Sequence, residues 1–187
     1  MRLALLLIAL AAPALAEPVP YALDVGGSSV GFTVNMGDQA VNGTMPVSAA
    51  QLLLDFDQVA NSTINVTLDP SGTRTGLIFA TEALKAETLL NTAAFPQIQF
   101  VSTAVSAGAD PTQAEVDGNV TIRGVSRPLR LHAQLYRQAG TIAGNIDKLS
   151  LLLTGTLNRN DFGASGYPGM VSDQVTLNIT AQIDRGG

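Results

Sequence analysis

Hydrophobic and polar side chains alternate most regularly between residues 116 and 136, in the stretch VDGNVTIRGVSRPLRLHAQLY. Alternation with a period of two places successive side chains on opposite faces of an extended strand. Two such arms flank residues 124–126, which begin with Gly124, a residue that adopts the positive φ of a tight turn without strain. The pattern predicts a β-hairpin with one apolar face. Because a two-stranded ribbon cannot bury that face by itself, we expect the rest of the chain to cover it.

Shorter alternating runs recur along most of the remaining chain. They cover residues 30–36, 40–45, 51–56, 61–69, 97–106, 141–157 and 171–183. Their spacing, with Gly, Pro and Asp between them, is typical of an all-β sandwich or barrel. About eight antiparallel strands can close into a barrel whose lumen is either filled by side chains or holds one ligand. The predicted fold is therefore an all-β antiparallel barrel of about eight strands, and the pattern leaves both kinds of lumen open.

One segment departs from the strand pattern, the stretch TEALKAETLLNTAA at residues 81–94. It is rich in Ala, Leu, Glu and Lys, which favour helices, and Glu82 suits the first turn of a helix. Pro96 prevents the helix from continuing. The sequence predicts one helix near residues 81–94.

The first 16 residues have the features of a secretory signal peptide. Arg2 is followed by an apolar run at residues 3–12, and Ala14-Leu15-Ala16 offers a cleavage site with small residues. The apolar run is too short to span a membrane, and no later stretch reaches that length. We therefore expect a signal peptide at residues 1–16, one domain at residues 17–187 and a periplasmic location.

Composition narrows the classes of function. The formal net charge is −5, which argues against a nucleic-acid partner. The chain has no cysteine and a single histidine, His132, so neither a thiol nucleophile nor a cysteine-built metal site is available. No carboxylate cluster replaces them, and we expect no metal and no catalytic cofactor.

Two groups of polar residues are candidates for chemistry. Arg123, Arg127 and Arg130 surround the hairpin turn and could bind a phosphate or another polar head group. The alternative is that they form a solvated turn that protects a sheet edge, and we favour it. An enzyme that acts on a lipid-like substrate would have to use His132 or the loop of Asp161. A single histidine on a polar strand face is a weak candidate for a general base, so we expect that the protein is not an enzyme.

Several segments, in the same order along the chain, resemble the YceI family of secreted lipid-binding proteins. They are SVGFTV at 29–34, the stretch from Asn61 to SGTRT at 71–75, LK at 84–85, LLN at 89–91, FPQIQFVST at 95–103, GNVTIRGVSRPL at 118–129, NRNDFG at 158–163 and VSDQVTL at 171–177. Each segment is short, but the ordered set covers nearly all of residues 17–187. The sequence departs from the family at Leu89-Leu90, where the family has paired aromatic residues, and at Met45, where a Phe is common.

The resemblance implies a lipocalin-like β-barrel whose apolar tunnel holds a long isoprenoid, such as a quinone or a prenyl phosphate. It implies a periplasmic binding or carrier protein, with that lipid or a similar one as its partner. Two alternatives stay open: an envelope interaction module with a solid core and no lipid, and the enzyme described above. A homodimer also stays open.

The predicted ligand contacts are the inward positions of the alternating strands, the helix Leu with the Phe that follows it, and Phe162, which we expect at the mouth of the barrel. They are Phe32, Val34, Leu54, Ile64, Val66, Leu84, Phe95, Ile98, Phe100, Val120, Ile122, Leu131, Leu135, Phe162, Leu177 and Ile179. Each of them could equally be an ordinary core residue.

Overall fold

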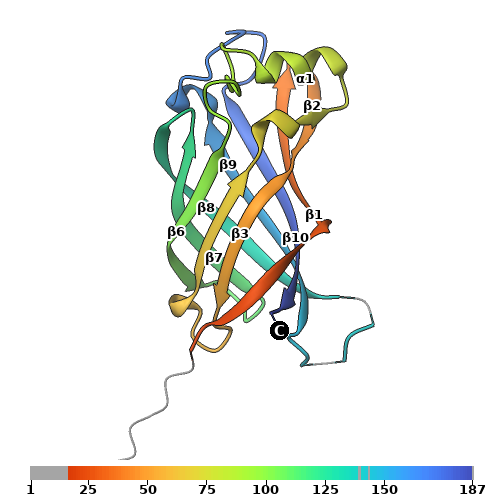
Figure 1. Cartoon of the computed structure of the whole chain (residues 1–187), viewed down its shortest axis with the longest axis vertical. Helices are drawn as coiled ribbons and strands as arrows, with labels where there is room; N and C mark the ends of the chain where they lie inside the picture. The colour runs from red at the N-terminus through yellow and green to blue at the C-terminus, as the bar shows by residue number, and fades with distance from the viewer. Residues whose placement is uncertain (1–16, 139, 143, 187) are drawn as a thin grey trace, which may run out of the picture.

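The structure is a computed structural model that describes residues 17–138, 140–142 and 144–186. The predicted signal peptide lies outside the described residues. The described part contains ten strands, one α-helix and three short 3₁₀ helices (Figure 1). In chain order they are β1 (Val19–Met36), β2 (Gln39–Met45), β3 (Val47–Leu54), η1 (Val59–Asn61), β4 (Thr63–Leu68), η2 (Pro70–Gly72), β5 (Arg74–Thr75), α1 (Ile78–Lys85), β6 (Ile98–Ala107), β7 (Gln113–Ile122), β8 (Val125–Arg137), β9 (Lys148–Asn158), η3 (Arg159–Phe162) and β10 (Gln174–Arg185). The predicted strand at 141–157 begins only at Lys148.

Neighbouring strands pair in the order β10, β9, β8, β7, β6, β4, β3 and β1. The sheet closes into a barrel because β10 also pairs with β1. The first part of β1 pairs with β3 and its second part pairs with β2, and only Pro46 separates β2 from β3. Proline lacks the backbone donor that a ladder needs, so it divides one wall strand into two. The wall therefore consists of eight strand positions, with β2 and β3 sharing one. The predicted antiparallel barrel of about eight strands is confirmed.

The hairpin of β7 and β8 follows the predicted alternation. Val116, Val120 and Ile122 are buried on its inner face, whereas Arg130 and His132 are exposed on the outer face. The turn is tighter than predicted, since Ile122 already pairs with Val125 and only Arg123 and Gly124 lie between the strands. Both turn residues have positive φ, at 52° and 73°. This is the backbone that a two-residue hairpin turn requires, and it explains why Val125 and Ser126 belong to β8 instead.

The helix differs from the predicted one at both ends. α1 spans Ile78–Lys85, and Ala86 leaves the helix with extended backbone angles. The chain then turns back on itself, with backbone bonds from Leu90 N to Leu84 O and from Asn91 N to Ala86 O, and with a φ of 48° at Asn91. This turn buries Leu89 at the end of the barrel, which a continuous helix would have placed elsewhere. Tertiary packing therefore outweighs the helix propensity of residues 86–94.

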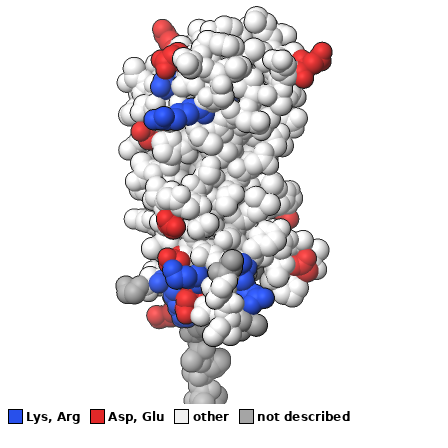
Figure 2. All heavy atoms as spheres, turned by 90° about the vertical axis from the view of Figure 1, so that its right-hand side faces the viewer, with Lys and Arg blue, Asp and Glu red and all other residues white. Residues whose placement is uncertain are grey.

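The two ends of the barrel are built from different parts of the chain (Figure 1). The lower end carries the start of β1 and the end of β10. The upper end carries two segments that we call the cap: residues 78–95, which include α1, and residues 159–173, which begin with η3. In Figure 2, charged side chains are densest toward the lower end of the face that is shown, a smaller group lies toward its upper end, and the middle of that face has few. Two ion pairs at the lower end join β10 to residues at the start of β9, Lys148 with Asp184 and Arg185 with Asp147.

Candidate ligand-binding cavity

A cavity of about 260 Å³ occupies the inside of the barrel. Side chains from the barrel strands, from α1 and from the cap line it, and nearly all of them are apolar. Ser28, Arg159 and Thr180 are the polar or charged residues among them. The site therefore offers a long apolar surface with few hydrogen-bonding groups, which suits a hydrocarbon chain better than a polar ligand.

Fourteen of the sixteen residues predicted from the sequence lie on this cavity wall. They are Phe32, Val34, Leu54, Ile64, Val66, Leu84, Ile98, Phe100, Val120, Ile122, Leu131, Phe162, Leu177 and Ile179. Strand alternation placed most of them correctly, because the inner face of a closed sheet faces the lumen at every second residue. That they contact a ligand stays a prediction.

The other two predicted residues lie outside the cavity. Phe95 follows the turn at Asn91, and its ring lies under the guanidinium of Arg123, whose central carbon is 6.0 Å from the ring centroid. Leu135 packs against the apolar cluster at the lower end of the barrel, which includes Leu149 and Ile183. Phe95 and Leu135 were predicted to line the cavity, and neither does. The chain changes direction before Phe95 and moves it outward, and Leu135 packs where side chains already fill the lumen.

The structure adds wall residues that the sequence reasoning did not select. They include Met45, Leu52, Leu89, Leu90, Val116, Leu129, Leu151, Leu153, Leu157 and Val175. Strand parity could have identified most of these, because Leu151 and Leu153 share a face with Leu149 and Val175 shares one with Leu177. Leu89 and Leu90 depend on the turn after α1, for which the sequence carries no comparable signal.

The interior is hollow toward the cap and filled toward the lower end. Val175, Leu177 and Ile179 face inward on β10 and yet remain partly exposed, because the lumen around them is open. On the same strand and the same face, Ile183 borders the cavity at its lower end but is 0% exposed. It belongs to a buried cluster with Tyr21, Leu52, Leu54 and Leu149.

The seal at the lower end continues into the turn after β3. The ring of Tyr21 meets that of Phe56 edge to face, with centroids 5.6 Å apart, and the Tyr21 hydroxyl donates to Ile146 O. Burial raises the pKa of this hydroxyl. Beside it, the Asp55 carboxylate accepts hydrogen bonds from the Asn61 side chain at 2.9 Å and from the backbone of Gln58 at 2.7 Å, with a third from Asp57 N. These bonds, that of Asn61 first, hold the pKa of Asp55 below its usual range.

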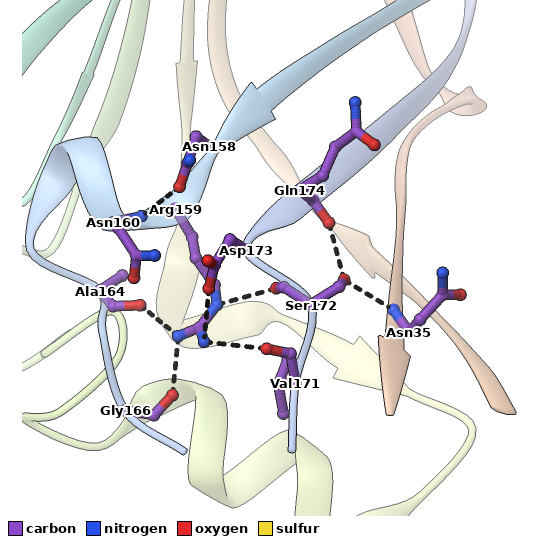
Figure 3. A network of polar contacts seen from close by, with 10 residues as sticks. All are labelled: Asn35, Asn158, Arg159, Asn160, Ala164, Gly166, Val171, Ser172, Asp173 and Gln174. Atoms are coloured by element: carbon purple, nitrogen blue, oxygen red, sulfur yellow. Dashed lines mark hydrogen bonds and ion pairs between the residues drawn. The ribbon is translucent and has the colours of Figure 1, made fainter. Parts of the chain in front are cut away.

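At the upper end, Arg159 organises the second segment of the cap (Figure 3). It is 6% exposed, and its guanidinium donates to Ala164 O at 2.6 Å, Gly166 O at 2.7 Å and Ser172 O at 2.9 Å. Longer contacts reach Val171 O at 3.1 Å and Asp173 Oδ1 at 3.5 Å. Because protein acceptors occupy its nitrogens, Arg159 holds residues 164–173 together and is not free to bind a ligand head group.

Arg123 has a similar role in the first segment of the cap. Its Nη1 atom donates to Glu87 O at 2.6 Å and to Leu89 O, so it fixes the turn after α1 to the β7–β8 hairpin. A backbone bond of 2.9 Å from Gly166 N to Thr88 O joins the two cap segments. Both segments are thus held through backbone carbonyls.

The contacts of the arginine cluster show how its members are used. Arg123 is engaged with the cap, and Arg130 forms two bonds to the Asp117 carboxylate, at 2.6 and 2.9 Å. The bonds from Arg130 hold the pKa of Asp117 below its usual range. Arg127 donates to the adjacent Ser126 O at 3.1 Å. Arg123 and Arg130 therefore stabilise the cap and a strand pair of a closed sheet, a role that differs from the solvated, edge-protecting turn that was expected.

The two residues considered for catalysis lie away from the cavity wall. His132 is exposed on the outside of β8, where its Nδ1 is 2.7 Å from Glu115 Oε1, and Asp161 is exposed in η3. Within the described ranges, no three His, Cys, Asp or Glu side chains group as they would around a metal ion. No helix in this part of the chain is both long and apolar enough to cross a membrane.

A closed antiparallel barrel with one helix and an apolar lumen defines a class of small β-barrel proteins. The sequence model described as "YceI-like domain" matches residues 21–183, and the chain therefore belongs to this family. A UPF0312 protein of Pseudomonas syringae pv. tomato is 30% identical over 163 residues, 86% of this chain and 83% of the relative. Protein YceI of Salmonella arizonae is 27% identical over 165 residues, 87% of this chain and 85% of that protein.

Solved structures have the same fold at low sequence identity. BcnA of Burkholderia cenocepacia superposes with a TM-score of 0.75 at 18% identity, over 86% of this chain and 99% of the other. A polyisoprenoid binding domain from Saccharophagus degradans, implicated in plant cell wall breakdown, gives a TM-score of 0.65 at 12% identity, over 90% of this chain and 99% of that chain. At these identities the likeness concerns the fold alone.

Proposed function

We propose that this protein binds an isoprenoid or similar lipid in the barrel lumen and carries it through the periplasm. The observation that carries the proposal is the lumen itself, an apolar cavity whose inward-facing residues on β10 remain partly exposed. Family membership and the polyisoprenoid binding domain with the same fold support it. In a solid-core interaction module, these inward-facing residues would instead be buried as completely as Ile183 is in this structure.

The volume of the cavity bounds the affinity. At about 30 Å³ for a group of water or methylene size, 260 Å³ holds about nine such groups. Burying each methylene group contributes about 0.8 kcal/mol, so about 7 kcal/mol is available before the costs of ordering the ligand. The cavity as described matches about two prenyl units. A longer chain, including the three prenyl units of farnesol, has to widen the lumen or extend beyond it.

The decisive experiment has two parts. The protein is purified without detergent from the periplasm of its own host, extracted with organic solvent and analysed by mass spectrometry, and the delipidated protein is then titrated with farnesol. We expect a prenyl lipid in the extract, in a stoichiometric amount, and saturable binding of farnesol. An empty extract together with no binding of farnesol, quinones or prenyl phosphates would contradict the proposal and favour the solid-core module.

Variants test whether the lipid occupies the lumen. Val120 is 5% exposed on the cavity wall, and Val101 is 48% exposed on the outer face of β6. Val120→Trp fills the lumen, so we expect it to abolish farnesol binding in a protein that still folds, and Ile122→Trp should do the same. Val101→Trp makes the same chemical change outside and should bind normally. Undiminished binding by folded Val120→Trp would place the lipid elsewhere.

A further inference from the structure

Two phenylalanines on the cavity wall lie directly over glycines of the neighbouring strand. A Cβ atom placed on Gly43 would overlap the ring of Phe32, with Cε1 and Cε2 at 2.8 Å and Cζ closer still. A Cβ atom on Gly118 would lie 2.5 Å from Phe100 Cζ and 2.7 Å from its Cε2. Both glycines are buried. Neither glycine has a positive φ, so the backbone conformation does not require glycine at these positions. Glycine is required because the phenyl ring occupies the space that a side chain would fill.

The strand register explains how each ring reaches its glycine. Phe32 in β1 pairs directly with Gly43 in β2. Phe100 in β6 pairs with Val120 in β7, and its ring extends diagonally to Gly118 on the same face. Side chains directly or diagonally opposite on one face of a sheet are within contact distance, and aromatic rings pack well over glycine. Each ring therefore lies along the wall instead of pointing across the lumen.

We infer that Gly43 and Gly118 set the width of the lumen and thereby let it admit methyl-branched chains. The inference rests on the proposed function and names the feature that selects the ligand. A phenyl ring is about as large as a prenyl unit, and the cavity holds about two such units. If a Cβ displaced either ring from the wall, the ring would turn into the space that the ligand needs. A branched chain, being wider, would lose more than an unbranched one.

Gly43→Ala is the cleaner of the two tests. The three atoms nearest to its Cβ all belong to the Phe32 ring, which can rotate, whereas a Cβ at Gly118 would also lie 2.6 Å from Val101 O in the backbone. The matched control is Gly76→Ala, since no atom lies within 4 Å of a Cβ at that position. The two probes are farnesol and dodecanol, which has the same main-chain length but neither the methyl branches nor the double bonds.

In wild-type protein, farnesol binding tests the proposed function on its own, and its absence would refute that function whatever the variants do. Given that binding, we expect Gly43→Ala to weaken farnesol by about tenfold or more and dodecanol by clearly less. Gly76→Ala should bind both alcohols like the wild type. A folded Gly43→Ala protein with an unchanged ratio of the two affinities would overturn the inference while leaving the proposed function intact.

A second variant keeps the test decisive if Gly43→Ala folds poorly. Replacing Phe32 by Leu in the Gly43→Ala background removes the ring that the new methyl group displaces. We expect this double variant to regain both folding, measured by its thermal transition, and the wild-type ratio of the farnesol and dodecanol affinities. A double variant that folds but does not regain this ratio would also overturn the inference.

Discussion

At the lower end of the barrel, Leu149 and Ile183 are 1% and 0% exposed and pack with Tyr21 and Leu52 into a filled core. At the upper end, two cap segments cover the lumen, and Arg123 and Arg159 hold them mainly by donating to backbone carbonyls. Apolar packing is rigid and penalises any void, whereas hydrogen bonds between a side chain and a loop can exchange with water. The comparison indicates that apolar packing closes the lower end, whereas side-chain hydrogen bonds to loop carbonyls contribute to holding the cap in addition to buried residues such as Phe162.

The largest effect is expected from shortening the same residue type at the two levels of β10. Ile183 borders the cavity but is fully buried in the lower cluster, so Ile183→Ala removes packed contacts and should cost about 2–5 kcal/mol in the free energy of unfolding. Ile179→Ala enlarges a cavity that already exists, so it should cost clearly less. Urea denaturation of both variants measures the difference. Equal losses would mean that the lumen around Ile179 is packed, and the contrast between the two ends would fail.

Removing the Arg159 side chain should loosen the cap. Arg159→Ala leaves the buried Ala164 O and the part-buried carbonyls of Gly166, Val171 and Ser172 without their donor, and an unsatisfied buried carbonyl costs about 1–3 kcal/mol unless water replaces the donor. We expect faster amide hydrogen exchange at residues 163–173 and little change in β9 and β10. Arg185→Ala, which removes a largely exposed arginine from the lower end, is the control. If exchange accelerated across the whole barrel instead, Arg159 would belong to the global core.

Arg123 should have a smaller effect, confined to the first cap segment. Arg123→Asn removes the bonds to Glu87 O and Leu89 O, and asparagine tolerates the positive φ of this turn. The expected loss is about 1 kcal/mol, with faster exchange at residues 86–92. Arg127→Ala loses one bond to the adjacent residue and should change neither quantity. If the two variants gave similar results, the bonds of Arg123 would not be what holds the first cap segment.

Acid should weaken the lower end through Asp55. Its pKa is lowered in the folded state, so the stabilisation is present above the unfolded value of about 3.9 and is lost as pH falls through the folded value. We expect the wild type to lose stability in this acidic range and Asp55→Asn to lose less over the same range. Unfolding midpoints from pH 7 downward test this. Parallel curves for the two proteins would show that another group governs the acid response.

Strand alternation was sufficient to place most of the cavity wall. Val120 and Leu177 could be assigned to the inner face from their neighbours, because a strand turns each second side chain the same way in any sheet. The closure of the barrel could also be expected, since a long antiparallel sheet has edges to protect. These are local rules, and they hold wherever the strand lies in the fold.

The features that the sequence did not reveal depend on contacts between distant segments. The chain after α1 could have continued as a helix by propensity, but burying Leu89 and bonding its carbonyl to Arg123 favour a turn, and the same turn moves Phe95 outside. Arg159 and Arg123 look like free cations in the sequence, and only their acceptors, up to 36 residues away, show otherwise.

The sequence by itself determined the barrel and which face of each strand is apolar, because those follow from neighbours along the chain. Only the tertiary structure decided how the ends close, and that the lumen is left open by Phe32 and Phe100 lying over Gly43 and Gly118, because these depend on where separate strands and loops meet.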